Sequence, residues 1–235
     1  MPTMPPRPGK SQLLQIATHV GALLPLAWMV YAIFTDNLTV NPIQDLTFRT
    51  GKTALVLLVL SLACTPTYSL FKFRPALNMR RPLGVYAFVY IALHLTIFLF
   101  DNFFWAFGFT WENLKTTILE KRYVLVGFAA FLIFLPLAFT STKGWQKRLG
   151  KNWKTLHKWV YLADLLVIIH YIWLVKADTT EPLAWGAGVL ILLALRLPLI
   201  KKGAQTLLAR LPRPGKRPTP KSPPREPASV KLTEP

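Results

Sequence analysis

Six long apolar stretches dominate the sequence and restrict the chain to a small set of folds. A helix needs about 20 mostly apolar residues to cross the roughly 30 Å hydrocarbon core of a bilayer. Because backbone polar groups cannot stay unpaired there, only helices and closed barrels span that core. The expected spans are residues 13–34, 54–71, 83–104, 123–139, 156–175 and 183–200. The sequence therefore predicts an all-α integral membrane protein with a six-helix transmembrane bundle.

The segments on either side of the apolar stretches differ from them in composition, so the chain divides into three parts. Residues 1–12 form a short N-terminal segment, and the apolar run after it is too long for a signal peptide. Residues 13–200 form the transmembrane domain. Residues 201–235 are basic and rich in proline, and they lack the apolar residues that offset the entropy cost of ordering. We expect this tail to be disordered.

Lysines and arginines are unevenly divided between the two sides of the predicted bundle. Most of the 28 lie in the N-terminal segment, in the second-to-third and fourth-to-fifth connections, and in the tail. Cations beside short connections mark the cytoplasmic side, so both termini are expected in the cytoplasm. The net charge of +18 is therefore assigned to topology and contact with membrane lipid, and we expect no nucleic-acid binding.

Four histidines occur in the predicted spans or at their ends, where an ionisable residue marks a functional candidate. At 1.5 Å per residue, His94 and His170 lie about 17 Å and about 21 Å from the cytoplasmic ends of their spans, so they can share one level. His157 lies at the cytoplasmic end of its span, about 20 Å from His170 along the axis. Two levels of imidazole suit haem groups stacked across a membrane.

The same residues leave other interpretations open. At about 100° per residue, His157 and His170 do not share one face of an ideal helix. The histidines could be structural, or they could form a proton path with Asp164, which would make the chain a proton-coupled membrane transporter. His19 could face His157 across the bundle or pack against a neighbouring helix. Asp164 could exchange protons or pair with a neighbouring helix.

The sequence lacks residues that two other kinds of site would need, namely a cysteine-based site and a phosphate-binding loop. Cys64 is the only cysteine, so the chain cannot form an internal disulfide, an iron–sulfur cluster or a Cys-rich zinc site. Gly51-Lys52-Thr53 ends like a phosphate-binding loop, but Leu46 stands where that motif needs its first glycine. We interpret this segment as the start of a helix.

Several segments together resemble one family of bacterial membrane proteins. They are His19 to Pro25, Thr50 to Leu55, Thr65-Pro66, Arg80 to Gly84, Leu93 to Leu95, residues 137–142, Leu149 to Trp153, Leu156 to Leu162, and His170-Tyr171. Their combination, over roughly residues 13–200, is similar to the MsrQ (YedZ) family of the ferric-reductase-like transmembrane superfamily.

The resemblance implies a haem-binding membrane subunit that passes electrons across the bacterial inner membrane. The partner would be a periplasmic, MsrP-like molybdopterin enzyme that reduces methionine sulfoxide in oxidised envelope proteins, joined to this chain as a heterodimer. The chain itself is expected to be a non-catalytic electron-transfer subunit, because no span offers a cysteine pair. A cytoplasmic flavin reductase or quinone would be the electron donor. The family is described as binding haem b and FMN.

The family's haem ligands map to His94, His157 and His170. Related oxidases and reductases carry a second histidine about 13 or 14 residues earlier in the third span, where this chain has Arg81. We therefore expect one haem between His94 and His170, and a role for His157 toward a second haem, a flavin or a propionate. Arg80 and Arg81 suit a flavin phosphate or haem propionate, or they serve only as topology signals. His19 is a further possible contact.

Overall fold

The computed structural model describes residues 9–105, 110–175 and 177–210, and every regular element in those ranges is helical. A π-helical turn, η1 (Asp101–Trp105), and a 3-10 turn, η2 (His157–Trp159), lie between α-helices. The helices are α1 (Lys10–Phe34), α2 (Pro42–Phe71), α3 (Pro75–Phe100), α4 (Trp111–Glu120), α5 (Arg122–Phe139), α6 (Lys143–Leu149), α7 (Lys151–Leu156), α8 (Val160–Leu174), α9 (Thr180–Ala194) and α10 (Pro198–Arg210). The predicted all-α class is confirmed for the described residues.

Four helices are long and apolar enough to cross a membrane, namely α1, α2, α3 with its π-helical extension, and α5. A fifth crossing is reached only if α9 and α10 count as one span, although they are bent by 92° at the break between them. Helix α8 has 15 residues, which extend about 22 Å, less than the roughly 30 Å of a hydrocarbon core. The structure therefore supports a multi-pass membrane protein, with four or five spans by these criteria.

The second helix begins earlier than the sequence predicted. It starts at Pro42, where proline suits the first helical position, and the Asn41 side chain accepts a hydrogen bond from the backbone N–H of Gln44. The segment 51–53 consequently lies inside α2. Our interpretation of that segment as a helix start was wrong, because the polar residues before it are themselves helical.

The last predicted span ends early, and the chain turns. Helix α9 ends at Ala194, and Pro198 opens α10 in a new direction because its ring cannot continue the earlier hydrogen-bond ladder. Helix α10 docks on α2, where the Gln205 side chain donates a 2.8 Å hydrogen bond to the carbonyl of Ser69. Residues 201–210 of the predicted tail are thus helical, and residues 211–235 lie outside the described residues.

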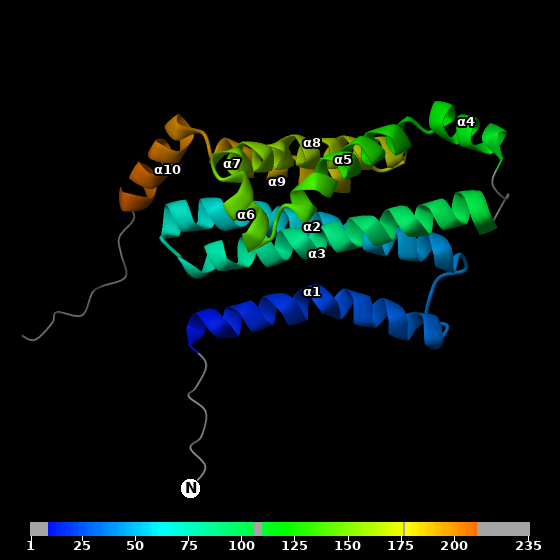
Figure 1. Cartoon of the computed structure of the whole chain (residues 1–235), viewed down its shortest axis with the longest axis horizontal. Helices are drawn as coiled ribbons and strands as arrows, with labels where there is room; N and C mark the ends of the chain where they lie inside the picture. The colour runs from blue at the N-terminus through cyan, green and yellow to red at the C-terminus, as the bar shows by residue number, and fades with distance from the viewer. Residues whose placement is uncertain (1–8, 106–109, 176, 211–235) are drawn as a thin grey trace, which may run out of the picture.

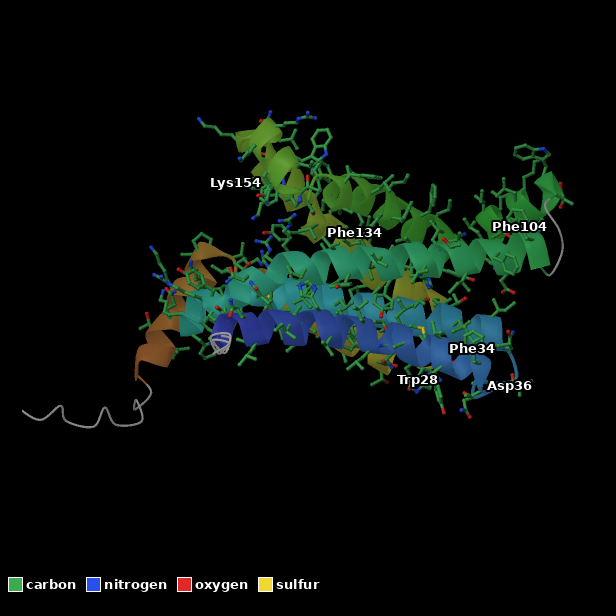
Figure 2. All side chains as sticks on the ribbon, turned by 60° about the horizontal axis from the view of Figure 1, so that its bottom comes forward. Trp28, Phe34, Asp36, Phe104, Phe134 and Lys154 are labelled. Atoms are coloured by element: carbon green, nitrogen blue, oxygen red, sulfur yellow. The ribbon has the colours of Figure 1, made fainter. Side chains whose placement is uncertain are left out.

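The long helices lie side by side, and their connections alternate between the two ends of the bundle (Figure 1). The start of α1, the α2–α3 connection, α6, α7 and α10 lie together at what we call the basic end; the α1–α2 connection and α4 lie at the opposite end (Figure 1). Lys154 marks the basic end and Asp36 the opposite end in Figure 2. Helix α2 packs along α3, α5 packs along α8, and α9 contacts both α2 and α8.

Small residues bring the helices together, and large apolar residues face outward. Ala87 and Ala163 are completely buried, which lets the helix backbones approach closely. Leu24, Phe139 and Leu190 are 60%, 67% and 58% exposed. A soluble protein rarely exposes this much apolar surface, so the outer face suits lipid.

Candidate haem site

His94 of α3 and His170 of α8 lie next to each other in the bundle. Their ring centroids are 6.1 Å apart, and the ring planes are nearly perpendicular, at 88°. Both side chains are half-buried. The structure thus brings together the two histidines that the depth estimate placed at one level.

Each ring is held from behind by a backbone carbonyl of a neighbouring helix. Nδ1 of His94 lies 2.9 Å from the carbonyl oxygen of Thr47 on α2, and Nδ1 of His170 lies 2.7 Å from that of Tyr123 on α5. Because a carbonyl oxygen only accepts, each Nδ1 must carry the proton and donate it. Nε2 of each neutral ring then keeps its lone pair, which is the state of an imidazole that binds a metal.

A glycine makes room for each ring, one helical turn after the accepting carbonyl. On α2 it is Gly51, where an added Cβ would lie 3.1 Å from Nδ1 of His94. On α5 it is Gly127, where an added Cβ would lie 2.6 Å from Nδ1 of His170. Residues one turn apart share a helix face, so the missing side chain is what lets the imidazole reach the carbonyl. We call each carbonyl with its glycine a histidine seat.

Sequence reasoning missed both seats. It treated Gly51 as part of a false phosphate loop and of a segment that resembles the family, and it gave Gly127 no role. A glycine within an apolar span was the available signal, because glycine weakens a helix interior and needs a packing or functional reason there. Which histidine each glycine faces could be known only from the packing of α2 on α3 and of α5 on α8.

The two imidazole nitrogens of His94 and His170 suit a metal whose other ligands come from a cofactor. In the ranges that the structure describes, no group of three or more His, Cys, Asp or Glu side chains could hold a metal ion. Haem iron takes only its axial ligands from the protein, because the porphyrin supplies the others. Two imidazoles on one metal, each bonded at about 2.1 Å, have ring centroids about 6 Å apart, close to the 6.1 Å observed. The pair therefore fits haem in chemistry and in spacing.

His157 lies nearer the basic end, where η2 separates it from the regular turns of α8. Its ring stacks on Trp153 at 4.0 Å, and its Nδ1 lies 3.1 Å from the Trp153 carbonyl. Its Nε2 is buried and has no hydrogen-bond partner among the described residues. Arg80 lies within electrostatic range. Buried polar atoms are normally paired, so this nitrogen is suited to meet a bound group.

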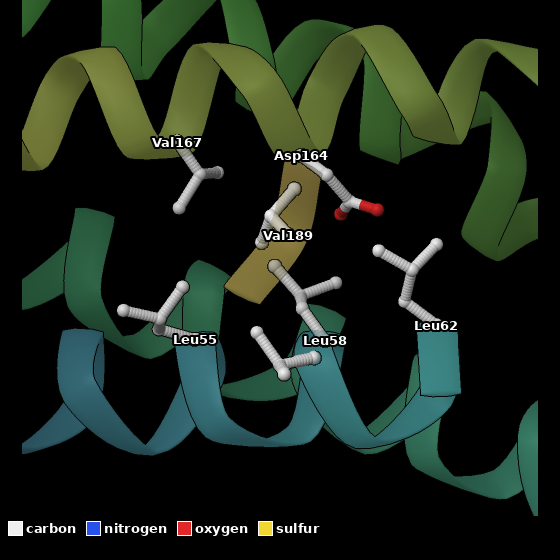
Figure 3. A pocket seen from close by; sticks show the side chains of 7 residues that line it. Leu55, Leu58, Leu62, Asp164, Val167 and Val189 are labelled. Carbon is white, nitrogen blue, oxygen red and sulfur yellow. The ribbon is translucent and has the colours of Figure 1, made fainter. Parts of the chain in front are cut away.

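Asp164 lies between the two histidine levels and is 4% exposed. Its carboxylate lies beside a closely packed apolar contact between α2, α8 and α9, shown in Figure 3. Its Oδ1 has no hydrogen-bond partner in the part of the chain that the structure describes. Arg196 and Arg80 are within electrostatic range of the Asp164 carboxyl group.

Arg196 joins α9 to two other helices at the point where the chain turns. Its guanidinium donates 2.7 Å hydrogen bonds to the Tyr161 hydroxyl on α8 and to the carbonyl of Leu62 on α2. Pro66 stands one turn after Leu62 and has no N–H, so this carbonyl lacks its usual helical donor. Arg196 supplies that donor. The contact explains how the Leu62 carbonyl keeps a hydrogen-bond donor in an apolar setting although Pro66 has no N–H.

The remaining predicted contacts lie apart from the histidine pair. Nδ1 of His19 lies 3.0 Å from the Tyr86 hydroxyl on α3, and the two rings meet edge-on, so His19 packs between helices and does not face His157. The backbone carbonyl of Arg80 accepts a hydrogen bond from Ser61. Arg81 is exposed at the basic end.

An all-helical membrane bundle with two neighbouring imidazoles, each held by a helix carbonyl, suits the class of haem-binding membrane proteins that transfer electrons. Comparison with known families agrees with this class. The family described as ferric reductase like transmembrane component matches residues 50–168. That range contains Gly51, His94, Gly127 and His157, and it ends just before His170.

Curated relatives give a narrower assignment. The protein of Xanthomonas axonopodis pv. citri is 40% identical over 185 residues, covering 76% of this chain and 83% of the relative. That of Rhodospirillum rubrum is 40% identical over 189 residues, covering 80% and 89%, and that of Herminiimonas arsenicoxydans is 38% identical over 201 residues, covering 84% and 90%. Each is named protein-methionine-sulfoxide reductase heme-binding subunit MsrQ. The chain belongs to this MsrQ family of ferric-reductase-like membrane proteins.

Proposed function

We propose that the chain carries electrons across the bacterial inner membrane to a periplasmic, MsrP-like molybdopterin methionine sulfoxide reductase. The observation that carries the proposal is the pair of imidazoles, each donating Nδ1 to a helix carbonyl, with ring centroids 6.1 Å apart. The name shared by the relatives links haem binding to methionine sulfoxide reduction in those proteins.

The chain's own residues would hold the cofactor and tune it. Haem b, when bound, supplies a reversible one-electron couple. His94 and His170 would provide the axial nitrogens, and the two histidine seats would fix the tautomer and direction of each ring. A hydrogen bond from the second ring nitrogen also raises the basicity of a ligating imidazole. The apolar helices around the two rings, together with membrane lipid, would limit the access of water to the site.

The proposed topology has six crossings, with both termini in the cytoplasm. The basic end would face the cytoplasm, since cations beside membrane spans favour that side. Helix α4 and the α1–α2 connection would then face the periplasm, where they could meet the MsrP-like partner in a heterodimer. A reporter fused after Ile200 should behave as cytoplasmic, and one inserted near Asn113 as periplasmic. The opposite pattern would reverse the proposed direction of electron flow.

The proposed electron entry is at the basic end. A cytoplasmic flavin reductase or quinone would be the donor, and FMN would bind there with its phosphate near Arg80 or Arg81. Guanidinium groups suit phosphate, and the buried, unpaired Nε2 of His157 lies on the same side. The resemblance to the MsrQ family is the source of the FMN proposal.

The test of the whole proposal is spectroscopic. Purified full-length protein should show the Soret band and the reduced α-band of b-type haem. Its reduced band should disappear when an MsrP-like enzyme and methionine sulfoxide are added together, and should remain when either is added alone. Folded but colourless protein would reject the proposal and favour a proton-coupled transporter that uses the buried Asp164.

A further inference from the structure

A long groove runs between α1 and the rest of the bundle, away from the histidine pair. It has a volume of about 580 Å³, and its walls come from α1, α2 and the start of α3. Small residues on both sides help to keep it open, namely Ala17 and Gly21 on α1 and Ala63 on α2. Ala17, Gly21 and Leu60 are also exposed, so the groove opens sideways on the lipid-facing surface.

Along the groove, α1 is fastened to α3. Its contact with α2, where the Arg49 guanidinium lies 4.4 Å from the Trp28 ring centroid, comes after Pro25, the last groove residue of α1. The hydroxyl of Tyr90 donates a 2.7 Å hydrogen bond to the carbonyl of Ala22, and the Tyr86 hydroxyl meets His19 at 3.0 Å. Both tyrosines lie on α3. Toward α2, an added Cβ on Gly21 would meet nothing within 4 Å. The space between α1 and α2 is therefore real and is not filled by described side chains.

The dimensions and polarity of the groove suit one hydrocarbon chain. Helix α2 lines the groove from Lys52 to Thr67, a length of about 22 Å along the helix axis. Half of a bilayer's hydrocarbon core is about 15 Å thick, so the groove is long enough to hold an acyl chain from one leaflet. Water does not fill an apolar space that offers it few partners. The surrounding membrane supplies acyl chains directly to a groove that opens on its side.

Charge at the mouth of the groove favours an anionic headgroup. Phe73 lines the groove at the basic end, and Lys72 and Arg74 on either side of it are exposed. Within the described ranges, the acidic side chains lie toward the opposite end, as Asp36 does in Figure 2, or are buried, as Asp164 is. No described carboxylate therefore competes for these two cations at the mouth.

We propose that this groove binds an anionic phospholipid, with one acyl chain between α1 and α2 and the phosphate on Lys72 and Arg74. The lipid completes the packing of α1, which the chain's own side chains leave open on this side. The proposal is independent of haem binding and of the sulfoxide reductase partner, because none of the groove residues belongs to the histidine site.

Photo-crosslinking in vesicles tests the proposal on the full chain. The probe is phosphatidylglycerol with a diazirine in one acyl chain, diluted into phosphatidylcholine vesicles, and crosslinked peptides are mapped by mass spectrometry. Crosslinks should concentrate on the groove faces of α1 and α2. Gly21→Leu should lose them by filling the groove, while Gly188→Leu, also in open space but on α9, should keep them. Ala17→Leu repeats the test at a second position.

A charge-matched pair of variants tests the headgroup contact. Lys72→Gln with Arg74→Gln should reduce crosslinking by phosphatidylglycerol by about fivefold for each cation removed. Lys201→Gln with Lys202→Gln removes the same charge from α10 at the same end and should leave the groove crosslinks unchanged. Even labelling of all lipid-facing helices, equal labelling by a phosphatidylcholine probe, or crosslinks from a second copy of the chain in the groove would each overturn the proposal.

Discussion

The two histidine levels of the bundle are built in different ways. At the paired level, His94 and His170 face each other from α3 and α8, and each has a carbonyl and a glycine behind it. Toward the basic end, His157 stacks on the Trp153 ring of its own segment, and Arg80 is within electrostatic range of it. The paired level offers two neighbouring imidazoles, each with its Nδ1 bonded to a helix carbonyl. The basic-end level offers one imidazole in a cationic setting.

The difference teaches that histidine count alone does not define a haem site. A metal-binding histidine needs a hydrogen bond from its other ring nitrogen, which fixes the tautomer and the orientation of the ring. At the paired level, two histidines each make such a bond to a carbonyl of a neighbouring helix. The basic-end level instead uses polar side chains to hold helices together, as Arg196 does for α2 and α8. The variants below test these two roles of polar groups separately: holding the paired histidines, and joining helices to one another.

Removing a paired histidine should have the largest effect. His94→Ala or His170→Ala leaves one axial nitrogen, so we expect loss of nearly all b-type haem absorbance at that level, measured by Soret intensity per chain. His19→Ala is the control, because His19 contacts only Tyr86 among the described polar partners. Full haem content in both His94→Ala and His170→Ala would show that the paired level is not the haem site.

Filling a histidine seat should weaken the site while keeping both ligands. Gly127→Ala places a methyl group about where the His170 ring lies, at 2.6 Å, whereas Gly51→Ala meets His94 at 3.1 Å. Loss of a partner behind a ligating histidine typically costs about 10–100-fold in metal affinity, and the larger loss should occur at Gly127. Haem retention and midpoint potential measure this effect. Gly188→Ala, which meets nothing within 4 Å, should behave as wild type.

Removing His157 should change the rate of electron entry and not the haem content of the paired level. His157→Ala should leave the haem that we propose between His94 and His170 in place, because His157 takes no part in that pair of rings. We expect slower reduction from the cytoplasmic side, or loss of a second haem or flavin signal, in a stopped-flow experiment with unchanged Soret intensity from the paired level. Complete loss of haem would show that the two levels are not independent.

Breaking the Arg196 contact should have the smallest effect on the cofactor. Arg196→Gln cannot keep both hydrogen bonds, so the Leu62 carbonyl loses its donor, at a cost of about 1–3 kcal/mol in the free energy of unfolding. Arg196→Lys should retain part of that stability. Thermal unfolding followed by circular dichroism measures both variants. A change in haem spectrum without a change in stability would assign Arg196 to the cofactor.

Much of the architecture followed from the sequence, although two boundaries did not. Apolar stretches and cation placement predicted a helical membrane protein, and the positions of His94 and His170 predicted a shared level. The bend after Ala194 was missed, because the apolar run continues through it and only Pro198 marks the turn. The early start of α2 was missed because its first turns are polar.

The sequence by itself determined which residues could bind iron and that they lie in apolar segments, since the first follows from side-chain chemistry and the second from local composition. Only the tertiary structure decided which carbonyl and which glycine stand behind each ring, because those contacts join helices far apart along the chain. It also decided that Arg196 replaces the donor that Pro66 removes. Local pattern fixes the depth of a residue in the membrane, whereas helix packing fixes what it faces.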